Sequence, residues 1–219
     1  MRSGGGIEFG DASWYAADVL REARMAGVNC PNALAVADRL GLPVRGIARG
    51  ATDCPGELSF DRYGRPVLRV WFDLQPQLLQ FVVGLLLGHW CLGARKLVRV
   101  DERAWSRRFA GALLAPDRSI WSAWLESSDI LDLCRRFPLV PSTTLMIRLR
   151  EAGVGRVFLF DVHDDQMHPT LGDEDPLTPA ICGAAANAFL YGRTVRPGIR
   201  AARLPDDRSR VAVVLSSAA

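Results

Sequence analysis

Apolar residues recur at helical spacing along much of the chain, and polar residues, prolines and glycines mark the ends of these stretches. We expect helices over residues 11–26, 33–40, 73–93, 101–114, 119–125, 128–137, 142–151 and 177–191. Asp11 or Ser13 can cap the first helix, because short polar side chains accept from the free N–H groups of a first turn. Asp73 is expected to cap the third helix and Ser142 the seventh.

Short apolar runs bounded by turn residues predict the strands. Residues 44–72 are expected to form strands, with apolar runs at 58–60 and 67–72, and further runs lie at 157–160, 199–204 and 211–215. Asp61, Gly64 and their neighbours separate the first two runs and predict an antiparallel hairpin. Residues 161–175 are expected to form an acidic loop. The order of elements predicts the α+β class, with a mainly helical domain, a small antiparallel sheet and a short α/β tail.

Composition and cysteine usage narrow the class of protein. With 219 residues, the chain can hold one sizeable core or a main domain with a small appendage. Its net charge of +3 is too small to indicate a nucleic-acid partner by itself. The five cysteines are odd in number and form no C-x-x-C pair, which argues against a disulfide framework and a zinc knuckle. Because the start also lacks the apolar core of a signal peptide, we expect a cytoplasmic protein.

One uncharged stretch, residues 74–94, has to be tested as a membrane span. Its continuous apolar run, residues 81–87, is shorter than the about 20 residues that a bilayer requires. Gln75, Gln77 and His89 would also be costly in lipid. We therefore expect a buried core helix and no membrane contact.

Residues 81–90 of this helix read F-V-V-G-L-L-L-G-H-W and are laid out like the active-site helix of a zinc peptidase. Such a site needs H-E-x-x-H, in which two histidines one turn apart bind zinc and the glutamate activates water. With His89 as the second histidine, Leu85 stands at the first histidine and Leu86 at the glutamate. A site that lacks this ligand and this general base cannot carry out metal-assisted hydrolysis.

This helix and the block that follows it resemble the ImmA/IrrE family of metallopeptidase-like proteins, over about residues 14–155. The family patterns are F-x-x-x-H-E-L-G-H-W/L and E-x-x-A-N-x-F-A-x-x-L-L-x-P. The residues that fit them are Phe81, Gly88, His89, Trp90, Phe109, Ala110, Leu113, Leu114 and Pro116. The chain departs from the family at Leu85 and Leu86. The acidic ligand of the second block is also missing, since Glu102 lies one residue outside the expected window.

The resemblance implies a domain organisation and a function. After a disordered start at 1–10, the expected parts are a zincin-like domain at 11–127, a helix-turn-helix-like segment at 128–155 and an α/β extension at 156–219. It implies an inactive pseudopeptidase without a cofactor, which binds another protein, such as a helix-turn-helix repressor or an antitoxin-type partner. The small sheet would hold an extended partner by β-augmentation. The expected groove residues are Leu68, Val70, Phe72, Trp90 and Trp105.

Two other functions remain open from the sequence. A zinc-dependent peptidase with non-standard ligands would use His89 and Glu102 together with ligands that the sequence does not identify. A direct DNA-binding regulator would use residues 131–153, where a short turn separates two helices. Its phosphate contacts would come from Arg135, Arg136, Arg148 and Arg150. Its reading face, however, is poor in base-edge donors.

A second pair of histidines, His163 and His168, lies among aspartates. Clusters of His and Asp bind divalent ions, but this spacing matches no zinc pattern. Asp164 and Asp165 are typical of a hairpin turn. We therefore expect a solvated loop here.

Overall fold

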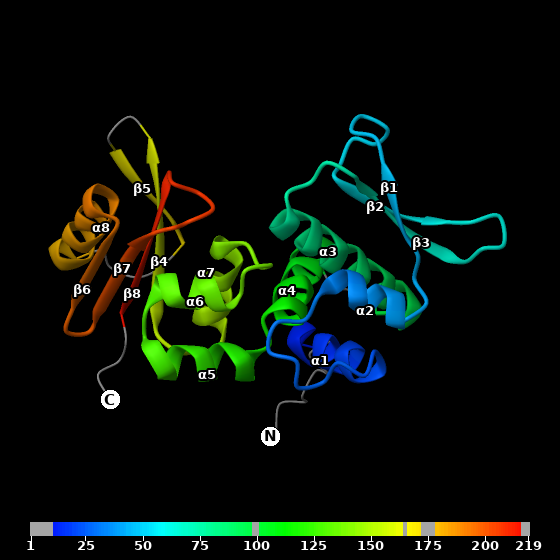
Figure 1. Ribbon diagram of the computed structural model, residues 1–219, viewed down its shortest axis with the longest axis horizontal. Helices are drawn as coiled ribbons and strands as arrows, with labels where there is room; N and C mark the ends of the chain where they lie inside the picture. Colours follow the sequence, from blue (N-terminus) through cyan, green and yellow to red (C-terminus); the bar gives the residue numbers. More distant parts are fainter. Residues whose placement is uncertain (1–10, 98–100, 164–165, 172–177, 216–219) are drawn as a thin grey trace, which may run out of the picture. The chain divides into compact units, whose positions relative to one another are not determined.

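Eight helices and eight strands form the secondary structure of the residues that the computed structural model describes, which are 11–97, 101–163, 166–171 and 178–215 (Figure 1). The strands form one sheet of three and one of five. This arrangement confirms the α+β class predicted from the sequence. The chain divides into two compact units, Met1–Pro116 and Asp117–Ala219, which are described separately below.

The first unit holds four helices and the three-stranded sheet. Its elements are α1 (Ala12–Glu22), α2 (Ala33–Arg39), β1 (Val44–Ile47), β2 (Gly56–Phe60), β3 (Pro66–Trp71), α3 (Pro76–Ala94) and α4 (Glu102–Leu114). Asp11 caps α1 by accepting from the Ser13 N–H at 3.0 Å. α1 ends earlier than predicted, because Arg24 adopts a left-handed φ of 54° and the chain turns there.

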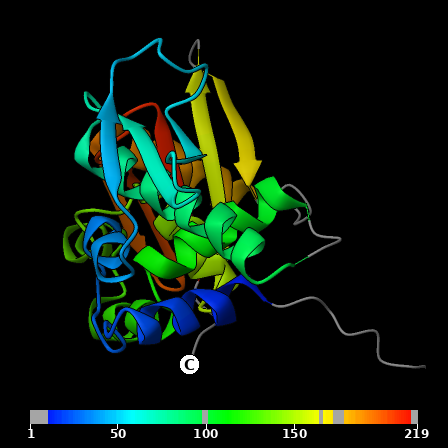
Figure 2. The ribbon, with the colours of Figure 1, turned by 90° about the vertical axis from the view of Figure 1, so that its right-hand side faces the viewer.

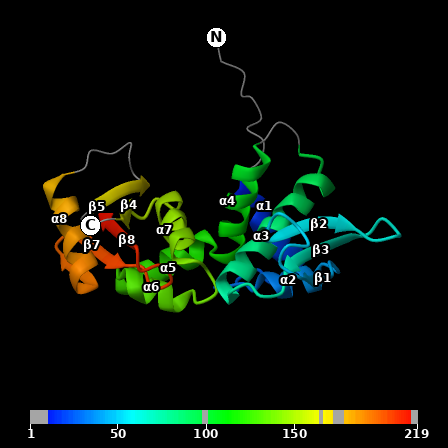
Figure 3. The same cartoon turned by 90° about the horizontal axis from the view of Figure 1, so that it is seen from above.

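The small sheet has the order β1-β3-β2, so β3 is its central strand. β2 and β3 form the predicted antiparallel hairpin, with Leu58 opposite Leu68. On the other side of β3, β1 pairs in parallel, with Val44 opposite Leu68. The hairpin turn projects beyond the helices of this unit, as Figures 1 and 3 show. Gly64 allows this turn by adopting a φ of 74°.

Helix α3 is the central helix of the first unit and packs against α2, α4, β2 and β3. The predicted cap at Asp73 is wrong: Gln75 occupies the cap position without a side-chain hydrogen bond, and Pro76 begins the helix. Gly84 lets α4 approach closely, since a Cβ there would lie 3.1 Å from the Cβ of Ala110. By length and hydropathy α3 is able to cross a membrane, but half of its apolar window is buried inside the structure. A core helix passes the same test, so this is weak evidence for a span.

The second unit contains the remaining elements. They are α5 (Asp117–Ser127), α6 (Ile130–Arg136), α7 (Ser142–Glu151), β4 (Arg156–His163), β5 (Gln166–Leu171), α8 (Pro179–Tyr191), β6 (Arg193–Arg196), β7 (Ile199–Arg203) and β8 (Arg210–Leu215). The predicted acidic loop at 161–175 is partly wrong, because β4 continues to His163 and β5 pairs back onto it (Figure 2). Residues 172–175 of that prediction lie outside the described residues.

The five-stranded sheet has the order β5-β4-β8-β7-β6 and is antiparallel throughout. α8 covers one face and buries Phe158, Phe160 and Val213 against its alanines. α7 packs on β4 and α6 on β7, and Leu159 and Val214 are buried as well. Because both faces of the central strands are covered, β4 and β8 carry nearly continuous apolar runs where an exposed sheet would alternate.

Candidate functional site

The peptidase-like motif lies in the middle and C-terminal half of α3, with its three key positions in different environments. Leu85 is half-buried, Leu86 is 5% exposed, and His89 is exposed. Neither leucine offers a donor atom to a metal, so the motif supplies only the imidazole of His89. Across the described part of the chain, no three His, Cys, Asp or Glu side chains come together as a metal site. The residues at this position therefore do not fit zinc.

A pocket is nevertheless present at the motif. It has a volume of about 640 Å³ and is lined by Leu86 and His89 of α3 and by Glu102 of α4. The structure thus brings together three of the residues that the sequence analysis considers at or near the peptidase-like motif. Gly56, Glu57 and Leu58 of β2 line the same pocket, so strand β2 flanks the motif.

Strand β2 approaches α3 so closely that only glycine fits at its first position. A Cβ at Gly56 would lie 2.6 Å from Cγ1 of Val82 and 3.1 Å from Cδ1 of Leu86. The carbonyl oxygen of Arg69 on β3 would lie 3.2 Å away, so the strand has little freedom to move aside. Gly56 therefore sets the width of the pocket beside Leu86.

The register of the hairpin shows which backbone groups of β2 are available. The Trp71 N–H donates to the Pro55 carbonyl at 3.0 Å, and the Asp61 N–H donates to the Arg65 carbonyl at 2.9 Å. In an antiparallel strand every second residue directs its backbone groups to the same neighbouring strand. Glu57 and Ser59 therefore direct theirs toward β3, as Pro55 and Asp61 do. Leu58 and Phe60 direct theirs to the outer edge of β2, where no strand of the described chain pairs. This edge can receive an extended segment.

The charged groups at the pocket are mostly acidic. Glu57 forms an ion pair with Arg69 across the hairpin, so part of its charge is neutralised. Glu102 is exposed at the first turn of α4. Lys96 is the one basic residue of the pocket lining. Apolar walls from Leu58, Leu86, Leu92 and Leu97 surround these charges.

The groove expected from the sequence needs correction, because β3 is the central strand and β1 and β2 are the two edge strands of the sheet. Leu68 and Val70 are 0% and 3% exposed and belong to the core. Trp105 is 7% exposed and stacks on Phe109, with ring centroids 5.3 Å apart. Phe72 is exposed, and Trp90 lines a different pocket. The parallel pairing of β1, which no hairpin signal predicts, occupies the second side of β3 and leaves β1 and β2 as the edge strands.

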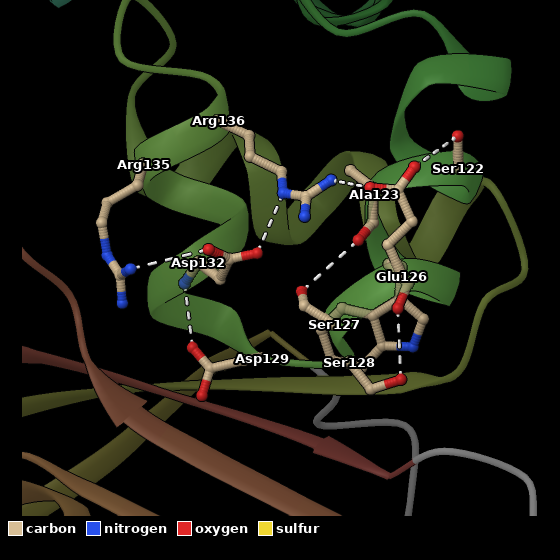
Figure 4. Close-up of polar contacts among 10 residues, drawn as sticks. Ser122, Ala123, Glu126, Ser127, Ser128, Asp129, Asp132, Arg135 and Arg136 are labelled. Carbon is tan, nitrogen blue, oxygen red and sulfur yellow. Dashed lines mark hydrogen bonds and ion pairs between the residues drawn. The ribbon is translucent and has the colours of Figure 1, made fainter.

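The helix-turn-helix-like segment corresponds to α6 and α7, and its exposed arginines are held in ion pairs. Figure 4 shows Arg136 of α6 contacting Glu126 and Asp132, the latter at 2.9 Å. Arg135 lies 3.6 Å from Asp132. Arg136 is thus a link between α5 and α6, and its charge is already matched by carboxylates.

Arg148 of α7 is not a surface residue. It is 2% exposed and forms ion pairs with Asp117 and Glu151. Met146 of α7 is fully buried, and Arg150 is half-buried with contacts of its own. α7 therefore serves as a packing helix against β4 and α5, with little charge or donor surface left for DNA.

The histidines at 163 and 168 lie on neighbouring strands, with Asp161 opposite His168 in the register. Both histidines are exposed. The Asp161 carboxylate accepts from Arg210 at 2.7 Å, so it is engaged in the sheet. Asp164 and Asp165, expected in the turn, lie outside the described residues.

Comparison with solved structures shows a similarity of fold. A Mycobacterium tuberculosis transcriptional regulator of known structure matches 94% of this chain and 76% of its own chain, with a TM-score of 0.54 and 18% sequence identity. At this identity the likeness shows the fold alone. No protein-family model and no curated protein sequence matches the chain.

Proposed function

We propose that this protein is a catalytically inactive, ImmA/IrrE-like pseudopeptidase that acts in transcription regulation by holding a segment of another protein. The partner would be a helix-turn-helix repressor or an antitoxin-type regulator. Its segment would lie extended along the outer edge of β2, over the pocket at Leu86, His89 and Glu102. No step of the proposed action involves a metal.

The observation that carries this proposal is a pocket at the place where the motif lacks a metal ligand and a general base. Leu86 fills the place of the general base and buries an apolar side chain, which contributes about 1–3 kcal/mol to stability. The strand beside it keeps an open edge at Leu58 and Phe60. A pocket beside an unpaired strand edge is suited to binding a peptide even when no reaction follows.

The fold similarity supports the regulatory part of the proposal. The matched protein is described as a transcriptional regulator, and its fold extends over nearly the whole of this chain. Regulation through a protein partner also agrees with the second unit, in which the arginines expected to contact DNA are paired with carboxylates.

The first test measures metal content. Protein purified without a chelating tag is expected to carry no stoichiometric zinc, whereas a Leu85→His/Leu86→Glu double variant is expected to gain it with His89 as a ligand. His89→Ala added to the double variant is the control and should abolish the gain. Stoichiometric zinc in the natural protein would contradict the proposal and favour the alternative of a peptidase with non-standard ligands.

The second test identifies the partner segment. A photo-crosslinking amino acid placed at position 58, on the open edge of β2, should capture a transcriptional regulator in cells of the source organism. Position 78 is the control, since Leu78 is 42% exposed on the first turns of α3 and away from the pocket lining. Equal capture from both positions, or none from position 58, would count against binding at this edge.

A further inference from the structure

A second pocket of the first unit has no role in the proposed function. It has a volume of about 680 Å³ and is lined by Asp38, Arg45, Asp61, Arg65 and Trp90, with prolines and leucines between them. This volume lies within the range of small-molecule sites. The neighbouring residues His89 and Trp90 thus line two different pockets.

Two of the four charged residues in this pocket neutralise each other. Arg65 lies 2.8 Å from Asp61, whose other carboxylate oxygen accepts from the backbone N–H groups of Tyr63 and Arg65. The backbone N–H of Arg65 lowers the pKa of the Asp61 carboxyl, and the Arg65 guanidinium acts in the same direction. The hairpin turn therefore uses both charges for its own structure.

The other two charges are not used by the fold. Within the described residues, the side chains of Asp38 and Arg45 form no ion pair or hydrogen bond, with each other or with a third group. Asp38 lies on α2 and Arg45 on β1, and both side chains are exposed at the pocket. One free carboxylate and one free guanidinium thus line the same pocket, beside the half-buried indole of Trp90.

We infer that this pocket binds a small zwitterion, namely a molecule that carries both an α-ammonium and an α-carboxylate group. Asp38 would accept from the ammonium, and Arg45 would donate to the carboxylate in its planar, two-pronged geometry. Trp90, Leu40 and Leu42 would contact an apolar side chain between the two charged ends. Because the four charges sum to zero, the pocket favours a ligand without net charge over a simple anion or cation.

Calorimetry on the full chain tests this inference with defined probes. Leucine, phenylalanine and the unblocked dipeptides made from them are expected to bind at millimolar concentration or below. Their N-acetylated and C-amidated forms each lack one charge, and we expect the affinity to fall by about tenfold or more. Arg45→Gln and Asp38→Asn should each weaken binding to a similar extent, about tenfold.

Matched controls separate this pocket from general effects of charge and from the proposed function. Arg103→Gln and Asp53→Asn change exposed residues that line neither pocket and should leave the affinity unchanged. His89→Ala alters the pocket of the proposed function and should also leave it unchanged. No saturable binding, or equal binding of blocked and unblocked probes, would overturn the inference. Loss of affinity for only one of the two blocked forms would show a site for a single charge and would overturn it as well.

Discussion

At the scale of single residues, Gly56 is the position that most directly shapes the candidate site. The strand passes so close to α3 that a methyl group at residue 56 would overlap Val82. We expect Gly56→Ala to lower the free energy of unfolding by about 1–3 kcal/mol, because Val82 has a stiff side chain and cannot turn aside. Urea denaturation of the purified variants measures this change.

A double-mutant cycle makes the Gly56 prediction specific. Val82→Ala alone should destabilise through its own cavity, but it also removes the methyl group nearest to residue 56. The double variant should therefore lose less stability than the two single variants added together. Gly93→Ala is the control, since a Cβ at Gly93 meets no atom within 4 Å. Strict additivity of the two changes would show that the close contact is not the cause.

Burial also predicts how the cysteines react. Cys134 is 8% exposed, and burial raises its pKa from 9.0 to about 11, because an apolar environment disfavours the thiolate. We expect iodoacetamide at pH 8 to alkylate the exposed Cys54 readily and Cys134 only after unfolding, as mass spectrometry of the peptides can show. Since the folded-state pKa is raised, the stability contributed by this group is present below pH 9 and is lost as the pH rises toward about 11. Equal alkylation of both cysteines at pH 8 would contradict this.

At the scale of elements, α7 shows a cap that no local pattern reveals. The predicted cap, Ser142, is the first residue of the helix, and its N–H donates to the Asp206 carboxylate at 2.7 Å. Asp206 follows β7 and lies 64 residues further along the chain. Because α7 has no side-chain cap from its own N-terminal neighbours, a distant carboxylate takes that role.

We expect Asp206→Ala to cost about 1 kcal/mol of stability, as the loss of a helix cap does. Asp206→Asn keeps an acceptor oxygen in the same place and should cost less. Chemical denaturation that follows the second unit measures both. If the two variants were equally stable, the hydrogen bond to Ser142 would not stabilise α7.

The elements also show how far sequence reasoning extends. The helices and the β2–β3 hairpin could be predicted because spacing, caps and turn residues are local signals. His89 and Glu102, which the sequence offers only as ligands of an alternative metal site, both line the candidate pocket. The central place of β3 could not be predicted, because the parallel pairing of β1 with β3 is a contact between distant residues. The buried Arg148 was missed for the same reason, since its partner Asp117 lies on another helix.

At the scale of the whole molecule, each unit has a core of its own. Leu68, Leu87 and Phe109 are fully buried in the first unit. Phe158, Phe160 and Val213 form the centre of a separate cluster in the second. A part of a chain that has its own hydrophobic core, and that could in principle fold alone, behaves as a domain. The fold similarity, which covers 94% of the chain, extends over both units.

Because each unit has its own core, we expect a destabilising substitution in one unit to speed amide hydrogen exchange in that unit alone. Gly56→Ala should speed amide hydrogen exchange in the first unit and leave β4 and β8 protected. Arg148→Ala should do the reverse, because it leaves Asp117 and Glu151 without their shared cation and is expected to cost about 2–4 kcal/mol in the second unit. Arg148→Met keeps much of the buried volume and should cost less. If either variant accelerated exchange equally in both units, the chain would unfold as one cooperative body, and the pocket at β2 would depend on the second unit for its stability.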